Sequence, residues 1–169
     1  MKREYTDKEV REKLKNMCMV VDTREQVNQH ITDYFDQYKI AYESKGLGTG
    51  DYSFKTGDMY CHDEIVIERT ASLDEIAGNF TVDRKRFENE FLRAKAQGIK
   101  VFLLIENAAW NDIESHNYIS KLNPKSLLGS LLSWQARYNI TINFCRPEET
   151  GKLIYGICYY WLKNKLENG

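Results

Sequence analysis

Short apolar runs of strand length recur along the chain, and stretches with a helical spacing of apolar residues separate most of them. The clearest run, Lys100–Glu106 (KVFLLIE), is apolar at consecutive positions, as expected of a strand covered on both faces. Further strands are expected at Met17–Asp22, Ile40–Ser44, Asp51–Lys55, Glu64–Arg69 and Ile140–Cys145. Strands that alternate with helices around a buried sheet are typical of the α/β class. Turn signals between Asp51 and Arg69 indicate hairpins, so the central sheet is predicted to be mixed.

Helices are expected on both sides of this sheet, and several have recognisable end signals. Ser72 and Glu75 have the spacing of a capping box, and Gly98 suits the position after a helix end. The expected helices are Thr6–Asn16, Gln26–Tyr38, a short one after Ser72, Val82–Gln97, one capped by Asn123 before Pro124, and one from Pro147 to Leu166. A chain of 169 residues suits one domain, so we expect a single domain over residues 1–169, with a peripheral N-terminal helix in 1–16.

The composition argues against several classes of protein. Hydrophobic residues make up 42% of the chain and only two residues are proline, which argues against extensive disorder. Apolar runs of about five residues are too short for a membrane span, and the charged N-terminal segment lacks an export signal. Four widely spaced cysteines without a CxxC pair are expected to be reduced thiols in a cytoplasm. Because 24 Lys and Arg balance 25 Asp and Glu, any nucleic-acid partner would need a local basic patch.

Acidic residues stand at the ends of the expected strands. Asp22 and Glu25 follow the first strand, Asp51 opens another, Glu68 ends a third, and Asp74 follows one bend later. Carboxylates beside buried strands are costly unless they are solvated, paired or bound to metal. Oxygen ligands without His or Cys select Mg²⁺ or Mn²⁺, which activate water in phosphodiester hydrolysis. A single such acid is commonly an ordinary surface residue, so the prediction depends on these acids converging at one edge of the sheet.

The acids also belong to motifs in a specific order. VVDTRE (20–25) is followed by GDY (50–52) and then by IERT (67–70), with Asp74 after three further residues. This order resembles the XPF family of nuclease domains, whose signature is V-D-x-R-E, then G-D-x, then V-E-R-K-x₃-D. The resemblance covers about residues 19–106, including the segments DRKRFENE and VFLLIE. It is strongest for short, single-domain bacterial and phage-like members, since nothing resembles the helicase or helix-hairpin-helix domains of larger ones.

The resemblance implies a restriction-endonuclease-like core that cuts DNA with a divalent metal, Mg²⁺ or Mn²⁺. It further implies a branched or partly single-stranded substrate, a place in DNA repair or recombination, and a bacterial or phage-infected cytoplasm. The implied metal ligands are Asp51, Glu68 and Asp22, and the implied catalytic set adds Glu25, Arg69 and Asp74.

Thr70 stands where the family has a lysine. Along a strand, Glu68 and Thr70 face one side and Arg69 the other, so the family's acid and ammonium act on one site together. Threonine carries no charge, and three interpretations therefore stay open. A basic residue from elsewhere takes the role, the metal alone sustains slow cleavage, or the site is inactive and retains only DNA or metal binding.

Basic residues that could replace the lysine occur on other segments. Lys85 or Arg84, at the start of the following helix, is better placed than Lys55, which lies about 13 Å along the strand from Asp51. Arg84, Lys85 and Arg86 are also the predicted DNA-contacting patch, with a merely solvated helix face as the alternative.

The last helix is apolar and aromatic on nearly all sides, which indicates either a core helix or a dimer face. The resemblance favours a homodimer through this helix. The leading hypothesis is a metal-dependent DNA endonuclease of the XPF type. A catalytically weakened DNA-binding module and a structural dimerisation domain are the alternatives.

Overall fold

The computed structural model describes residues 4–169, so residues 1–3 of the predicted N-terminal segment 1–16 lie outside the described part. Over the described residues the chain forms one seven-stranded mixed sheet with the order β2-β1-β3-β5-β6-β7, and β4 pairs with β3. The strands are β1 Met17–Val21, β2 Tyr42–Ser44, β3 Tyr52–Thr56, β4 Met59–Tyr60, β5 Ile65–Thr70, β6 Lys100–Glu106 and β7 Ile140–Cys145. The predicted mixed sheet in an α/β fold is confirmed.

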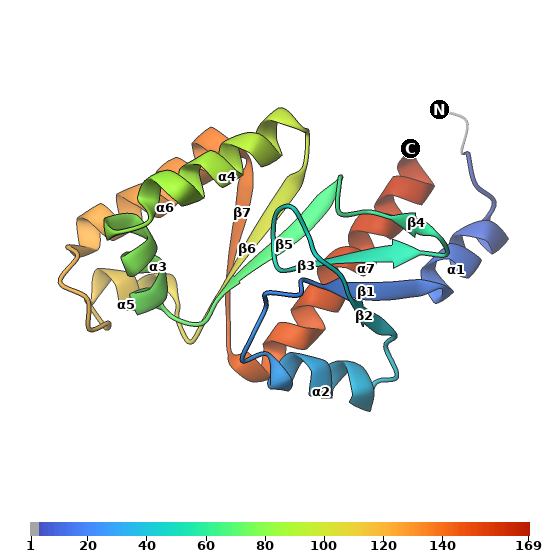
Figure 1. Ribbon diagram of the computed structural model, residues 1–169, viewed down its shortest axis with the longest axis horizontal. Coiled ribbons are helices and arrows are strands. Elements are labelled where there is room, and N and C mark those ends of the chain that lie inside the picture. The colour runs from blue at the N-terminus through green and yellow to red at the C-terminus, as the bar shows by residue number, and fades with distance from the viewer. Residues whose placement is uncertain (1–3) are drawn as a thin grey trace.

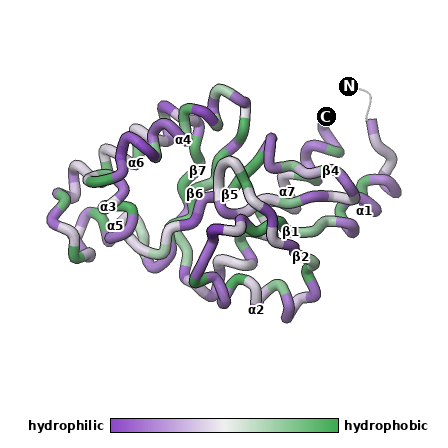
Figure 2. Tube along the Cα trace, in the orientation of Figure 1, coloured by the Kyte–Doolittle hydropathy of each residue, from purple (hydrophilic) through white to green (hydrophobic). Residues whose placement is uncertain are grey.

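Helices cover both faces of the sheet (Figure 1). One group consists of α3 Leu73–Thr81, α4 Arg84–Ala96, α5 Trp110–Glu114 and α6 Pro124–Tyr138. The other group consists of α1 Asp7–Lys15, α2 Gln29–Gln37 and α7 Pro147–Asn168. Green and purple segments alternate along these helices in Figure 2, as expected where only one side of a helix is buried. Within residues 4–169, no helix combines the length and apolarity needed to cross a membrane.

The two hydrophobic clusters meet the sheet through alternate residues of the same strands. On β5, Val66 packs into the cluster under α3, α4 and α6, whereas Ile65 and Ile67 pack into the cluster under α1, α2 and α7. Successive side chains of a strand point to opposite faces. We refer to these as the α4 face and the α7 face of the sheet. Both faces are buried, which explains the uninterrupted apolar runs in the sequence.

The strand register brings several strand ends to one edge of the sheet. β5, β6 and β7 are parallel, with Thr70 opposite Ile105 and Glu106 opposite Cys145. β1 and β3 are antiparallel, so the end of β1 lies beside the start of β3. Tyr52, the first residue of β3, in turn lies opposite Ile67 near the end of β5. The ends of β1, β5, β6 and β7 therefore lie at the same edge of the sheet as the start of β3.

Helix end signals are confirmed at Ser72 and Gly98, and also at Asn123, whose Oδ1 accepts the Lys125 N–H at 2.9 Å. The Ser72 hydroxyl accepts the Glu75 N–H at 3.1 Å, although the Glu75 carboxylate accepts the Ala71 N–H instead of completing a capping box. Gly98 follows α4 with φ +76°, the left-handed conformation that glycine adopts without strain.

Two helix predictions differ from the structure. Helix α2 begins at Gln29 rather than Gln26, because the Gln26 carbonyl accepts a hydrogen bond from Arg69 and Val27 has φ +53°. The five-residue helix α5 was not predicted, since so short a segment shows little apolar periodicity.

Candidate active site

Three predicted acids lie side by side at the shared strand edge. The Asp22 N–H donates to the Asp51 carbonyl at 2.8 Å, and the Asp51 N–H donates to the Ile67 carbonyl at 2.8 Å. Their neighbours Val21, Tyr52 and Ile67 point to the α7 face, so Asp22, Asp51 and Glu68 are directed to the α4 face. The backbone thus places three acids from three neighbouring strand ends on one face of the sheet.

Gly50 makes this approach possible. It has φ +77°, and a Cβ at this position would lie 2.6 Å from the Cβ of Val66. No real Cβ tolerates that contact, and the positive φ is itself unfavourable for other residues. The Gly-Asp pair of the GDY motif therefore delivers Asp51 close against strand β5.

Asp51 and Glu68 form a pair of partly buried carboxylates. Burial raises the pKa of Asp51, and the negative charges of Glu25 and Asp22 add to the rise, against the Arg69 N–H that donates to its Oδ2 at 2.8 Å. Burial also raises the pKa of Glu68 well above its ordinary value, and the charge of Asp51 adds to it. No donor in residues 4–169 forms a hydrogen bond to the Glu68 carboxylate. Such a pair is stabilised by protons or by a cation.

The donor set fits a hard divalent cation. Among the described residues, no group of three or more His, Cys, Asp or Glu side chains is arranged to hold a metal ion, so Asp51 and Glu68 stand as a two-carboxylate pair. Mg²⁺ is commonly bound through one or two carboxylates, with water and substrate phosphate completing its octahedral shell. Raised carboxyl pKa values indicate a site where positive charge is missing.

Asp22 is engaged differently from that pair. Its Oδ1 accepts from the Arg24 N–H at 2.9 Å and from Arg24 Nε at 2.7 Å, and its Oδ2 accepts from Leu47 N at 2.5 Å. Burial alone would raise the pKa of Asp22, but these hydrogen bonds outweigh it and the pKa is lowered. Both oxygens already have donors, so metal ligation by Asp22 stays a prediction.

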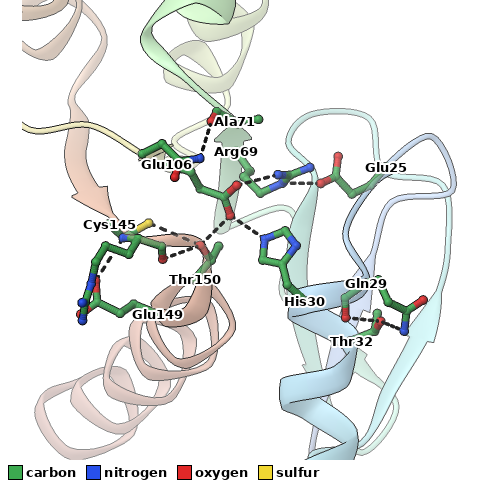
Figure 3. A network of polar contacts seen from close by, with 12 residues as sticks. Glu25, Gln29, His30, Thr32, Arg69, Ala71, Glu106, Cys145, Glu149 and Thr150 are labelled. Atoms are coloured by element: carbon green, nitrogen blue, oxygen red, sulfur yellow. Dashed lines mark hydrogen bonds and ion pairs between the residues drawn. The ribbon is translucent and has the colours of Figure 1, made fainter. Parts of the chain in front are cut away.

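Arg69 anchors the end of β5 on the α7 face (Figure 3). Its Nε donates to Glu25 Oε1 at 2.6 Å, Nη1 donates to Glu106 Oε2 at 3.0 Å, and Nη2 donates to the Gln26 carbonyl at 3.1 Å. The Tyr52 hydroxyl also donates to Glu25 Oε1, at 3.0 Å. The side chains of Glu25 and Arg69 therefore lie on the opposite face of the sheet from Asp51 and Glu68, while the backbone N–H of Arg69 donates to Asp51.

Glu106 ties this network to two helices. The Thr150 hydroxyl donates to its Oε1 at 2.6 Å, and His30 Nε2 lies 2.7 Å from the same oxygen (Figure 3). Burial would raise the pKa of Glu106, but the bonds from Thr150, His30 and Arg69 outweigh it and the pKa is lowered. The sequence assigned no role to Glu106, His30 or Thr150. The one available signal was that Glu106 ends an apolar strand as Glu68 does.

Glu90 and Arg24 also reach the site and had no assigned role. The negative charge of Glu90 on α4 contributes to the raised pKa of Glu68, after burial and Asp51, and the positive charge of Arg24 lowers it. Arg24 lay within the VVDTRE motif, and Glu90 within DRKRFENE. Neither could be placed near Glu68 without the positions of α4 and the loop after β1.

The remaining predicted residues lie at the margins of this edge. Asp74, in the first turn of α3, accepts the backbone N–H groups of Ile119 and Ser120 at 3.2 and 2.6 Å. Arg84 donates to Glu88, and 3.5 Å separates its Nη1 from Ser130 on α6. The participation of Asp74 and Arg84 in the site stays a prediction.

The other basic candidates make local contacts that do not involve the Asp51–Glu68 pair. Lys85 is exposed, Arg86 lies over the Phe87 ring at 4.9 Å, and Lys55 forms an ion pair with Glu43 on β2. Arg84 contacts Glu88 and lies near Ser130 of α6, and Lys55 is paired with Glu43, so replacement of the lysine by a basic residue from another segment stays a prediction.

The sheet order and this acid-lined edge define a restriction-endonuclease-like domain. Residues 21–157 match the family model described as the ERCC4 domain, and the chain belongs to that family. The predicted relationship to XPF is confirmed.

Solved structures agree on the fold. XPF from Aeropyrum pernix matches with a TM-score of 0.63 and 22% identity, over 85% of this chain and 60% of that chain. XPF from Aeropyrum pernix in complex with DNA matches with a TM-score of 0.64 and 20% identity, over 86% of this chain and 64% of that chain. The chain thus spans less than two thirds of these proteins. No curated protein matches it.

Proposed function

We propose that this domain is a DNA endonuclease that depends on Mg²⁺ or Mn²⁺ and cuts branched or partly single-stranded DNA in repair or recombination. The observation that carries the proposal is the Asp51–Glu68 pair, whose carboxyl pKa values are raised at the edge where three strand ends meet. Membership of the ERCC4 domain family supports a nuclease activity, and an XPF structure in complex with DNA supports DNA as the substrate.

Asp51 and Glu68 are the proposed metal ligands. A bound divalent cation would neutralise charge on the reacting phosphate and lower the pKa of a water molecule. The chain's own residues prepare the place: the Arg69 N–H orients Asp51, and the ion pairs of Arg69 with Glu25 and Glu106 fix the end of β5. Preorganised charges of this kind need no rearrangement when the reaction occurs.

Phosphate contacts are proposed at the start of α4. Arg84 and Arg86 form exposed ion pairs with Glu88 and Asp83, and Lys85 is exposed beside them. Exposed pairs contribute little stability, so these cations are available to exchange a carboxylate for a DNA phosphate. A local patch of this kind is consistent with a chain of net charge −1.

A homodimer through α7 is proposed as the assembled form. An apolar hollow of about 1160 Å³ lies along α7 and is lined mainly by aromatic and aliphatic side chains, among them Tyr34, Tyr155, Tyr159 and Trp161. Exposed apolar surface of this kind commonly marks a protein contact.

Cleavage and binding of the same DNA distinguish an enzyme from the alternative binding module, which is favoured by threonine in place of the family lysine at position 70. Labelled forked, flapped and single-stranded DNA would be incubated with wild type and Glu68→Gln in Mn²⁺. We expect wild type to cut at least one substrate and Glu68→Gln to lose ~10²–10³ in rate while still binding it. Binding without cutting by wild type on every substrate would reject the nuclease and leave the binding module.

A further inference from the structure

The loop between β2 and β3, Gly46–Gly50, has three glycines, and the fold requires only one of them. We refer to this segment as the glycine loop. Gly50 has a positive φ and lies close against β5, whereas Gly46 and Gly48 have no positive φ. A Cβ on Gly48 would meet no atom within 4 Å, and a Cβ on Gly46 would meet only Thr23 Oγ1, at 3.8 Å. The folded chain would therefore accept larger residues at both exposed positions.

The middle of the glycine loop is anchored beside the Asp51–Glu68 pair. Leu47 is 5% exposed, its N–H donates to Asp22 Oδ2 at 2.5 Å, and its carbonyl accepts from Arg24 Nη2 at 2.8 Å. The Asp22 N–H in turn donates to the Asp51 carbonyl at 2.8 Å. Position 48 precedes position 51 by three residues, so their Cα atoms are at most about 11 Å apart. The loop is thus held in place next to the proposed metal site.

The glycine loop presents main-chain donors without partners. Within the described part of the chain, the N–H groups of Gly46, Gly48 and Thr49 donate no hydrogen bond, and the Thr49 hydroxyl makes none. Main-chain N–H groups are strong donors that need water or a ligand when the fold leaves them unpaired. Glycine has no side chain to keep a ligand away from them. Lys45, which is exposed, adds a positive charge at the start of the loop.

A phosphate of a DNA strand suits these donors best. Main-chain N–H groups commonly bind phosphate oxygens, both in anion sites and along DNA backbones. A free phosphate ion would be repelled by the carboxylates of Asp22 and Asp51. A phosphate in a strand whose neighbours are already bound at the site has a high effective concentration there, which offsets that repulsion.

We propose that the glycine loop binds a backbone phosphate of the substrate DNA through the main-chain N–H groups of Gly48 and Thr49. This phosphate neighbours the one that reacts at the Asp51–Glu68 pair, so the contact holds the strand in register at the site. Main-chain donors to phosphate read no base, so the contact is the same for every DNA sequence. The inference rests on the proposed nuclease function.

Substitution of Gly48 tests the contact without disturbing the fold. Binding of labelled forked DNA by wild type, Gly48→Ala and Gly48→Val would be measured by fluorescence anisotropy in metal-free buffer at several salt concentrations. Gly48→Val should raise Kd about tenfold, the effect of losing one hydrogen bond to a charged acceptor, and Gly48→Ala should raise it less. Both variants should melt within a few degrees of wild type, because the added side chain meets open space.

Salt dependence distinguishes a main-chain contact from a cationic one. Gly48→Val should keep the wild-type slope of binding against salt, because a neutral N–H group replaces no counterion on the DNA. Lys85→Ala should instead lower that slope by about one, as expected for a lost phosphate contact of a lysine.

Gly129→Val is the matched control. Gly129 is also exposed with open space around its Cβ position, and it lies on α6, which packs beside β7 at the opposite edge of the sheet from β2. Valine is more favourable than glycine inside a helix. Gly129→Val should therefore fold and bind DNA as wild type does.

The outcomes separate this inference from the proposed function. Wild-type Kd in Gly48→Val, or in a folded Gly48→Ala where Gly48→Val is unstable, would overturn the loop contact and leave the nuclease standing. A lower salt slope in Gly48→Val would assign the loss to a cationic side chain and overturn main-chain binding. Weaker binding by Gly48→Val beside a wild type that binds DNA but cuts none in Mn²⁺ would reject the nuclease and keep the contact. Absence of DNA binding by wild type would reject both.

Discussion

At the residue scale, Asp51 and Glu68 are neighbouring carboxyl groups whose pKa values are both raised. Burial raises both pKa values, the charges of Glu25 and Asp22 add to the rise at Asp51, and the charge of Asp51 adds to the rise at Glu68. Without metal, the folded protein therefore binds protons that the unfolded chain releases at lower pH. Stabilisation from this proton uptake is complete below the unfolded pKa values of about 4. It is lost as pH rises through the raised folded values. In the proposed metal-bound form, a divalent cation would replace the protons at neutral pH.

Measuring the free energy of unfolding at a series of pH values tests whether this contribution to stability falls as pH rises. In metal-free buffer, the unfolding free energy of wild type relative to Asp51→Asn/Glu68→Gln should fall as pH rises from about 4 to 7. The double variant holds neutral side chains and cancels the contribution of all other groups. Adding Mn²⁺ at pH 7.5 should raise the wild-type stability only. A difference that grows with pH, or that is flat, would show that the two carboxyls are not kept protonated by the fold.

Sequence motifs located the acids of the site but not the residues that hold them. Asp51 and Glu68 were identified because their motif neighbours and spacing are distinctive. Glu106, His30 and Thr150 come from β6, α2 and α7, and they meet only because parallel strand ends and two helix starts share one edge. A single sequence contains no signal for such a meeting of distant segments.

At the scale of elements, one buried hydroxyl adds a hydrogen bond to the apolar packing of α7 against the sheet. Thr150 is fully buried, and its hydroxyl donates a hydrogen bond to Glu106 Oε1. The other oxygen of this carboxylate, Oε2, accepts a hydrogen bond from Arg69. The start of α7 is thereby linked through Glu106 to the strand end that holds Asp51. Loss of this bond leaves a buried carboxylate short of a donor.

Thr150→Val and Thr150→Ser separate the hydroxyl from the shape of the side chain. Thr150→Val should lower the free energy of unfolding by ~1–3 kcal/mol, because a buried charged acceptor loses its donor. Thr150→Ser keeps the donor and should lose less. Urea denaturation of both variants gives the comparison. A loss of stability in Thr150→Ser with no loss in Thr150→Val would show that the packing of the methyl group, and not the hydrogen bond, secures α7.

Element boundaries followed local signals where those signals were strong. Gly98 ends α4 and the Ser72 side chain starts α3, because both act within one turn of the chain. Helix α2 starts later than expected because Arg69, more than forty residues away, binds the Gln26 carbonyl. Tertiary contacts of this kind override local propensity.

At the scale of the whole molecule, the aromatic surface of α7 is the proposed site of self-association. Tyr160 is 62% exposed, whereas Trp161 is partly buried and packs edge-on against Phe54 of the core, with ring centroids 6.0 Å apart. Substitution of Trp161 would therefore damage the fold as well as the surface. The two predicted roles of α7, core helix and dimer face, are compatible, because one side of the helix is buried in the core and the other is exposed.

Tyr160→Glu tests the dimer without disturbing the core. We expect wild type to sediment as a dimer at high micromolar concentration and Tyr160→Glu to sediment as a monomer with a melting temperature within a few degrees of it. A buried carboxylate at an interface is costly, whereas the same group on a solvated surface is not. A monomeric wild type at that concentration would remove the proposed homodimer.

The architecture as a whole was predictable because apolar periodicity and motif order agreed along the chain. Successive residues of β5 and β6 pack in turn against the two buried faces of the sheet, so these strands appear in the sequence as apolar runs. This is why the fold class could be predicted from the sequence. The prediction of one domain over residues 1–169 is untested by the fold itself. The position of the basic groups was not predictable, since each arginine could bind any of several acids.

Titration of Mn²⁺ into the metal-free protein at pH 7.5, followed by calorimetry, tests the central claim that Asp51 and Glu68 form a divalent-cation site. We predict saturable binding by wild type and at least about tenfold weaker binding by Glu68→Gln, because a hard cation loses one of two carboxylate ligands. Glu148→Gln, which neutralises an exposed acid of α7, should bind as wild type does. Absence of binding by wild type, or equal affinity in wild type and Glu68→Gln, would contradict the account.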